Sequence, residues 1–175
     1  MNVAFPDLEQ TFANTDRGTL TWVLNAYTIS FAALLIPAGR LADRFGRRFT
    51  FMAGLSLFAF SSLLVGAAPT FPILVVARVT QGVGGALLTP ASLGLLLAGT
   101  APSERMTVVA KWGSLTALGV ATGPVLGALI VNSHGWRWAF IVLPPFCLLS
   151  YLTGKNTLPE TPADANAPFP DIVGA

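Results

Sequence analysis

Long apolar segments alternate with short polar breaks along most of the chain. The apolar runs cover residues 20–38, 49–68, 73–100, 108–131 and 138–153. A helix needs about 20 apolar residues to cross a bilayer, with a working range of about 17 to 25. The third run exceeds that range, so it must tilt, kink near Pro90 or end before Gly99, and the fifth run needs two more residues. The pattern therefore predicts five membrane-spanning helices, at about 20–38, 49–68, 73–97, 108–131 and 136–153.

The composition strengthens the membrane interpretation. Hydrophobic residues make up 53% of the 175 residues and charged residues only 10%, whereas an ordinary soluble domain carries about 25% charged residues. This excludes a typical soluble enzyme, and the high hydrophobicity also excludes a disordered tail. Buried helices of a soluble core would need polar outer faces, and the runs contain none wide enough. We expect an all-α membrane protein that has the lipid bilayer as its partner.

The residues that carry catalytic or metal chemistry are scarce. Cys147 has no second cysteine with which to form an internal disulfide, and His134 has no second histidine or cysteine pair at metal-ligand spacing. A Ser-His-Asp site would have to use His134 in the loop-like stretch 132–135, where a plain loop histidine is the better interpretation. We therefore expect no enzyme activity, no metal site and no cofactor.

The basic residues indicate which way the helices run. If the polar break 39–48 is placed in the cytoplasm, that side carries seven basic residues and the outer side carries two, which satisfies the positive-inside rule. The cytoplasmic set is Arg40, Arg44, Arg47, Arg48, Arg105, Lys111 and Lys155, and the outer set is Arg17 and Arg137. Because this clustering follows membrane topology, it predicts no nucleic-acid partner. We expect a multi-pass protein of the cell membrane with loop 39–48 cytoplasmic.

The character of the chain changes after the fifth run. Residues 154–175 are polar and rich in proline, with no apolar run of spanning length. Such composition is typical of a linker. We therefore expect a transporter-like membrane domain over residues 1–153 and a cytoplasmic linker over residues 154–175.

The break between the first two runs carries the strongest motif. It reads GRLADRFGRR over residues 39–48. Its two glycines allow a helix to stop, turn tightly and restart, and its acid can pair with neighbouring arginines. A plain cytoplasmic loop would explain the arginines but neither the acid nor the glycine spacing. The stretch resembles the signature loop of the major facilitator superfamily, matched at Gly39, Asp43, Arg44, Gly46, Arg47 and Arg48. The resemblance implies a gating loop that latches the two halves of a transporter.

A second motif lies in the third run, around Arg78. This residue comes six positions after Pro72, which places it about 9 Å below the outer interface at about 1.5 Å per residue. An arginine at that depth usually faces a polar cavity, although it could also snorkel to the outer headgroups. Helical spacing puts one set of residues on a single face: Arg78, Gln81, Gly82, Gly85 and Thr89. The string RVTQGVGGA resembles the fourth-helix motif of the superfamily, which implies a place in the proton pathway.

A third motif lies in the fourth run. Glycines at i, i+4 and i+8 form a smooth stripe that permits close approach of another helix, and the proline introduces a kink. Ordinary small-residue packing would explain the glycines alone. With the proline included, the pattern resembles the fifth-helix motif of antiporters in the superfamily, which marks exporters. The matched positions are Gly119, Gly123, Pro124 and Gly127.

Two further stretches refine the resemblance to one branch. The strings WVLNAY at 22–27 and GWRWAF at 135–140 are similar to fourteen-helix drug:proton antiporters. This branch would export amphipathic small molecules in exchange for protons. The resemblance implies that Asn25 and Tyr27 join Arg78 and Gln81 in the proton or substrate pathway.

The resemblance covers helices two to six of the superfamily's amino-terminal half. The expected first helix and the remainder of the transporter are missing, and none of the five apolar runs contains Asp or Glu. We therefore expect that this chain does not transport by itself. Two alternatives stay open. One is a sugar or metabolite porter of the same fold, and the other is a non-transporting truncated fragment or helix-interaction protein.

Overall fold

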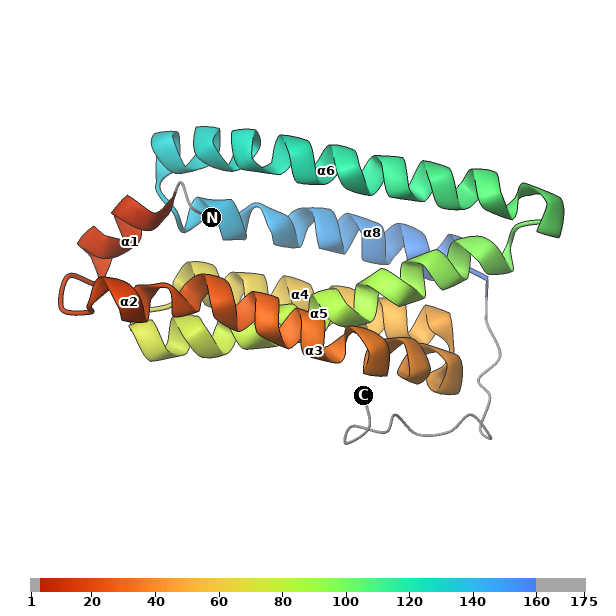
Figure 1. Cartoon of the computed structure of the whole chain (residues 1–175), viewed down its shortest axis with the longest axis horizontal. Helices are drawn as coiled ribbons and strands as arrows, with labels where there is room; N and C mark the ends of the chain where they lie inside the picture. The colour runs from red at the N-terminus through yellow and green to blue at the C-terminus, as the bar shows by residue number, and fades with distance from the viewer. Residues whose placement is uncertain (1–3, 160–175) are drawn as a thin grey trace.

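The structure is a computed structural model that describes residues 4–159, and Figure 1 shows a bundle of long helices. Five helices are long and apolar enough to cross a membrane, and the described residues contain no strand. The predicted all-α class with five spans is therefore confirmed. The elements are α1 (Phe5–Thr11), α2 (Arg17–Leu20), α3 (Trp22–Phe45), α4 (Arg47–Ala67), α5 (Phe71–Ala98), η2 (Pro102–Glu104), α6 (Arg105–His134), α7 (Trp138–Ile141) and α8 (Leu143–Thr157).

Helix α3 continues beyond the end that the hydropathy pattern predicts. It runs to Phe45 rather than to residue 38, so Gly39 is an interior helical residue and does not stop the helix. The turn lies at Gly46, whose φ of 92° is unfavourable for residues with a side chain. Charged residues that favour helix, among them Arg40 and Arg44, extend α3 past the apolar run. The polar break 39–48 is thus mostly helical, with a one-residue turn.

Prolines have different effects in the remaining spans. Helix α5 continues through Pro90 and ends before Gly99, and α6 continues through Pro124. The predicted fifth span is instead divided at Val142 into α7 and α8. Pro144, the second residue of α8, lacks the backbone N–H that would continue the hydrogen bonds from α7.

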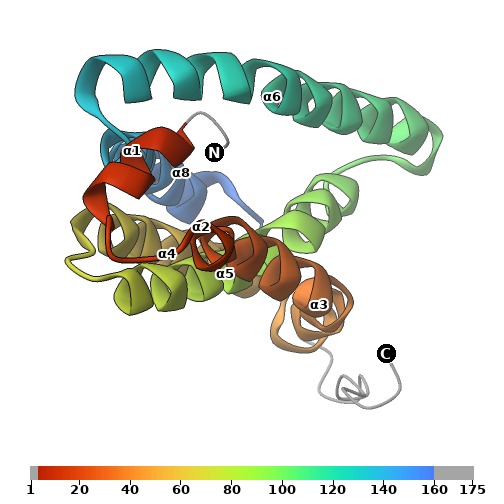
Figure 2. The same cartoon turned by 60° about the vertical axis from the view of Figure 1, so that its left-hand side comes forward.

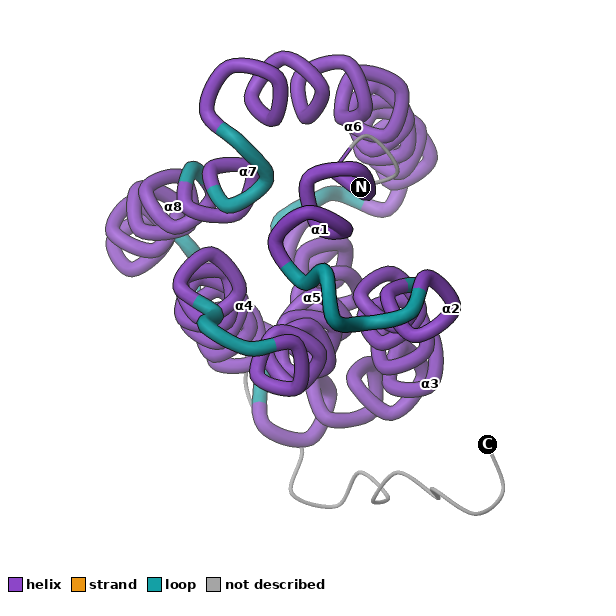
Figure 3. The backbone as a smooth tube through the Cα atoms, turned by 90° about the vertical axis from the view of Figure 1, so that its left-hand side faces the viewer, coloured by secondary structure: helices purple, strands orange, loops and turns teal. Residues whose placement is uncertain are grey.

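Helix α5 forms the centre of the bundle. Figure 3, seen along the helices, shows α5 between α3 and α4, and α8 packs on α4. Helix α6 crosses the top of Figures 1 and 2, apart from the three-helix core, and meets the rest of the chain near its two ends. Apolar side chains on α6 remain exposed, with Val120 73% exposed. The packed part of the chain is therefore the α3–α4–α5 core, with α8 beside it.

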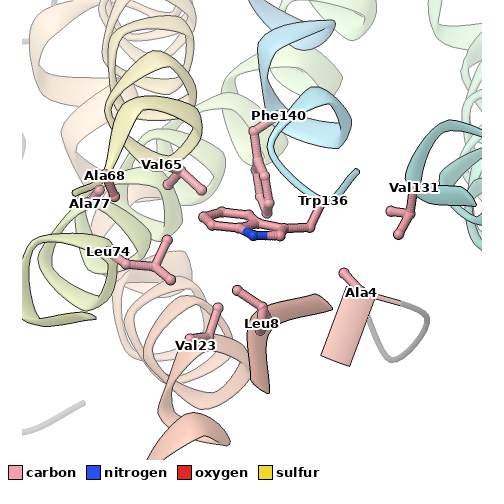
Figure 4. Packing of buried hydrophobic residues seen from close by; sticks show 10 residues of the cluster. All are labelled: Ala4, Leu8, Val23, Val65, Ala68, Leu74, Ala77, Val131, Trp136 and Phe140. Atoms are coloured by element: carbon pink, nitrogen blue, oxygen red, sulfur yellow. The ribbon is translucent and has the colours of Figure 1, made fainter. Parts of the chain in front are cut away.

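An apolar cluster closes one end of this core, as Figure 4 shows. The buried Trp136 indole donates a hydrogen bond from Nε1 to Thr11 Oγ1 over 3.1 Å, which ties the α6–α7 connection to α1. Phe140 stands edge-on to the same indole, with ring centroids 6.3 Å apart. Leu8 from α1 is buried in the same cluster. Van der Waals packing of this kind is the main source of helix association in lipid.

The helices alternate in direction, so the connections gather at two opposite ends. The α3–α4 turn, η2 and the end of α8 lie at one end in Figure 1, and α1, α2 and the α4–α5 turn lie at the other. This alternation is the one that the seven-to-two distribution of basic residues requires. The side of the membrane that each end faces stays a prediction. The predicted linker 154–175 lies, from residue 160 onward, outside the described residues, and α8 includes residues 154–157.

Candidate functional site

Arg78 points from α5 into the bundle. Arg78 is only 6% exposed. Its Nε group donates a hydrogen bond to the backbone oxygen of Val23 in α3, 2.9 Å away. A snorkelling side chain would instead carry its charge outward to the headgroups. The side chain of Arg78 is therefore directed into the bundle, and its place in a proton pathway stays a prediction.

Gln81 and Ser62 extend this contact into a buried polar network. Arg78 Nη1 donates to Gln81 Oε1 over 2.5 Å, and Gln81 Nε2 donates to Ser62 Oγ over 2.8 Å. Gln81 is 1% exposed and Ser62 is fully buried. The shared face of Arg78 and Gln81 follows from their i, i+3 spacing. Sequence reasoning missed Ser62; the signal that could have found it is a pair of hydroxyls in the otherwise apolar run 49–68.

Aromatic rings cover the Arg78 guanidinium. Its Cζ lies 4.4 Å from the centroid of the Tyr27 ring and 5.6 Å from that of Phe140. Both distances fall within the range in which a cation is attracted to the negative face of a ring. Tyr27 was predicted to belong to the pathway, whereas Phe140 was not singled out. Phe140 also packs on Trp136, so the arginine lies directly beside the apolar cluster of Figure 4.

A glycine in α5 lets α3 approach closely enough to bring Tyr27 over Arg78. A Cβ atom placed on Gly82 would lie 2.7 Å from the backbone oxygen of Tyr27 and would also collide with Ser30 Oγ. Real Cβ atoms do not come so close to a backbone oxygen, so a larger residue would push α3 away. The motif glycine is therefore a packing requirement of the arginine site.

The cation at the centre of this site has no carboxylate partner among residues 4–159. The ion pairs in this part of the chain join Arg17 to Glu9 and Arg47 to Asp43. Within the same residues, the Nη2 group of Arg78 makes no hydrogen bond. A buried charge in a membrane protein is costly and usually serves a functional site. Nη2 is thus a donor edge at which an acceptor could bind.

Asn25 lies outside the arginine site. It is exposed on α3, whereas Tyr27 contacts Arg78. Residues two apart on a helix point in directions about 200° apart, because each residue turns the helix by about 100°. Membership of Asn25 in a proton or substrate pathway stays a prediction, without support from a contact to Arg78.

The predicted gating loop forms a second polar site, at the end of the bundle opposite the apolar cluster of Figure 4. Arg47 Nη2 lies 3.2 Å from Asp43 Oδ1, and Arg47 Nη1 donates to the backbone oxygen of Gly94 in α5 over 3.0 Å. Arg48 Nη2 donates to the backbone oxygen of Lys155 in α8 over 2.7 Å. The motif thus connects α3, α4, α5 and α8. Gly39 and Arg44 lie in the last turns of α3.

The glycine stripe of α6 has no packing partner in the described part of the chain. A Cβ atom on Gly119, Gly123 or Gly127 would meet no heavy atom within 4 Å. The motif predicts close approach of another helix, and residues 4–159 do not supply that helix at this stripe. The small-residue face of α6 therefore borders open space.

Five apolar spans, with a buried, charged network between α3, α4, α5 and α7, define a multi-pass helical membrane protein with a polar site inside its bundle. The sequence model of the Major Facilitator Superfamily matches residues 1–171, and the chain belongs to that family. The family is one of transporters, which agrees with the expectation that the chain is not an enzyme.

Relatives of this chain are named for drug resistance and export. It is 38% identical to "Multidrug resistance protein Stp" of Mycobacterium tuberculosis over 155 residues, which are 87% of this chain and 29% of that protein. It is 38% identical to "Puromycin resistance protein pur8" of Streptomyces alboniger (99% of this chain, 34% of that protein). It is 33% identical to the "Tetracenomycin C resistance and export protein" of Streptomyces glaucescens (98% and 32%). The chain spans about a third of the length of these relatives.

Proposed function

We propose that this chain is the amino-terminal part of a longer proton-coupled transporter that exports drugs or other amphipathic small molecules. The names of the relatives support export of such compounds. The exporter-type motif at 119–127 supports the same direction of transport. The partners in this proposal are the lipid bilayer, the exported small molecule, protons and the remaining helices of the transporter.

The observation that carries the proposal is the buried Arg78 network. Alternating access requires a site near the middle of the membrane between two halves that rock against each other. Arg78 offers a positive charge with an unused donor edge inside the bundle, where an ionised carboxylate from another helix would be stabilised. A proton that binds this carboxylate would release it from Arg78. Binding and release of a proton would in this way alter the contacts between helices.

We further propose that the protein lies in the cell membrane with the 39–48 segment in the cytoplasm. The distribution of basic residues supports this orientation. In this orientation the Asp43–Arg47 pair and the bond from Arg47 to Gly94 lie at the cytoplasmic ends of α3, α4 and α5. Opening toward the cytoplasm would have to break contacts of this kind, which is the role expected of a gating loop.

The test is an export assay of the full-length transporter in proteoliposomes. The vesicles are loaded with buffer of one pH and diluted into another, and movement of puromycin and of the fluorescent cation ethidium is followed. The expected result is that the drug moves in the direction opposite to the flow of protons and that a protonophore abolishes this movement. Proton-independent uptake of a sugar with no drug movement would instead favour a metabolite porter. The 175-residue chain by itself is the matched control and should move neither drug.

A further inference from the structure

Ser62 holds the end of the Gln81 amide that lies away from Arg78. The Ser62 hydroxyl donates its single proton to the backbone oxygen of Phe58 over 2.6 Å, so toward Gln81 it can only accept. Gln81 must therefore present its NH₂ group to Ser62, and the distance from Nε2 to Oγ is 2.8 Å. The carbonyl oxygen at the other end of the amide is then directed at Arg78 Nη1.

We infer that Ser62 is a positioning residue for proton-coupled export, which acts on Arg78 through Gln81. The inference rests on the proposed function, because it gives Arg78 a role in transport. Ser62 does not touch the guanidinium; it accepts a hydrogen bond from the far end of the amide, so that Gln81 is held at both ends. The flipped orientation is disfavoured at both ends: the amide N–H groups would face the N–H donors of Arg78, and the amide oxygen would face Ser62 Oγ, which has no proton left to donate.

The surroundings of Arg78 give it few other means of holding its position. Its remaining contacts are the bond from Nε to Val23 and the rings of Tyr27 and Phe140. Attraction to a ring acts over a broad range of positions, whereas the bond from Nη1 to Gln81 has a defined direction. Loss of the bond to Gln81 would leave the bond from Nε to Val23 as the remaining directional contact, so the Nη end of the guanidinium could pivot beneath the rings. The unused Nη2 edge would shift with it.

The neighbouring Ser61 provides a matched control. It is also fully buried in α4, but its hydroxyl bonds only to its own helix, at Leu57 and Phe58. Replacement of Ser61 by alanine removes a buried hydroxyl without disturbing Gln81. Any effect that Ser62→Ala has beyond that of Ser61→Ala therefore reports the contact with Gln81.

The experiment compares four variants of the full-length transporter in the proteoliposome assay with ethidium. Ser62→Ala should lower kcat by roughly tenfold, the loss expected for one buried, unsatisfied amide group, while KM stays close to wild type. Ser61→Ala should export normally. In a Gln81→Met background, Ser62→Ala should cause no further loss, because the amide that Ser62 holds is gone.

Each alternative result has a defined meaning. Equal effects of Ser62→Ala and Ser61→Ala, or a full additional loss in the Gln81→Met background, would overturn the inference. If Ser62→Ala does not accumulate in the membrane, recovery of the protein in the Ser62→Ala/Gln81→Met double variant supports the inference, and failure of both contradicts it. A wild-type transporter that moves no drug would overturn the proposed function. Non-additive unfolding midpoints of the same variants in detergent would then still test the Ser62–Gln81 contact.

Discussion

The guanidinium of Arg47 occupies the space above Gly94 that a side chain would need. Arg47 Nη1 donates to the Gly94 backbone oxygen over 3.0 Å, and a Cβ atom on Gly94 would lie 2.6 Å from Arg47 Cδ. Arg47 belongs to the loop motif, whereas Gly94 lies 47 residues away in α5. The motif thus depends on a glycine outside it.

Gly94→Ala should weaken the connection between the start of α4 and α5. The new methyl group would displace Arg47 and break its bond to the backbone oxygen, at a cost of about 1 kcal/mol in the free energy of unfolding. Gly39→Ala is the matched control, because its Cβ atom would lie 3.8 Å from Pro90 in ordinary contact. Thermal unfolding in detergent measures both variants. A lower midpoint for Gly39→Ala than for Gly94→Ala would contradict the prediction.

Gly82→Ala should lower the stability of the protein more than Gly94→Ala or Gly39→Ala does. Its Cβ atom would meet the Tyr27 backbone oxygen at 2.7 Å, and a backbone atom can move only if α3 moves with it. Overpacking of this kind costs about 1–3 kcal/mol. Gly113→Ala offers a comparison, since its Cβ atom would have no neighbour within 4 Å. We expect a clear fall in the unfolding midpoint for Gly82→Ala and none for Gly113→Ala, and equal midpoints for these two variants would show that the helices adjust freely.

Arg78→Ala should abolish proton-coupled export while the protein still inserts into the membrane. The substitution removes the buried charge and leaves the helix backbone bonds intact. Arg78→Lys should restore export only in part, because lysine keeps the charge but lacks the planar fork of five donors. The measurement is drug export at matched expression levels. Near-wild-type export by Arg78→Ala would end the proposal that this residue couples protons to transport.

The two ends of the bundle should be accessible from opposite sides of the membrane. Phe45 ends α3 beside the Gly46 turn, and Thr70 lies in the α4–α5 turn at the other end. In a Cys147→Ser background, an impermeant thiol reagent should label Thr70→Cys in intact cells and Phe45→Cys only after the cells are opened. Labelling of Phe45→Cys in intact cells would reverse the proposed orientation.

Asp16 should make the short helix α2 sensitive to acid. Its carboxylate accepts hydrogen bonds from the Thr19 hydroxyl over 2.6 Å and from the Thr19 backbone N–H over 2.8 Å, and these bonds lower the pKa of Asp16. Since the pKa is lower in the folded state, the stabilisation is complete above the unfolded pKa of about 4 and is lost as the pH falls through the folded value.

The measurement is hydrogen exchange of the Thr19 amide in detergent between about pH 2 and pH 6, corrected for the intrinsic exchange rate. Protection of this amide should fall on the acid side. Asp16→Ala should reduce the protection and remove its pH dependence. A corrected protection factor that does not change with pH in the wild-type protein would show that the carboxylate does not cap α2.

Part of this structure follows from the sequence because it depends on neighbours along the chain. The number of spans comes from the length of the apolar runs, which must match the thickness of a bilayer. Arg78 and Gln81 share a face because helical geometry brings residues three apart together. Asp43 and Arg47 pair for the same reason, at i, i+4. Local geometry also explains why the Gly46 turn is recognisable, since a positive φ favours glycine.

Hydropathy predicts the boundaries of the helices less well than it predicts their number. Apolar length reports the lipid-facing part of a span, but a helix can continue into water when its residues favour helix, as α3 does up to Phe45. The division at Val142 depends on Pro144, whose effect on the α7–α8 junction cannot be read from mean hydropathy.

Only the tertiary structure decided what each buried group faces. A helix that is apolar on all sides carries no polar face to set its rotation about its own axis, so its neighbours cannot be deduced from its sequence. The contacts of Arg78 with Val23 and Tyr27, and that of Gln81 with Ser62, come from the packing of α3 and α4 against α5, and Phe140 reaches Arg78 from α7, which packs on α4. The sequence by itself determined that a charge lies within the membrane. The packing of helices at close range determined that it lies under two rings, beside an amide that a serine holds.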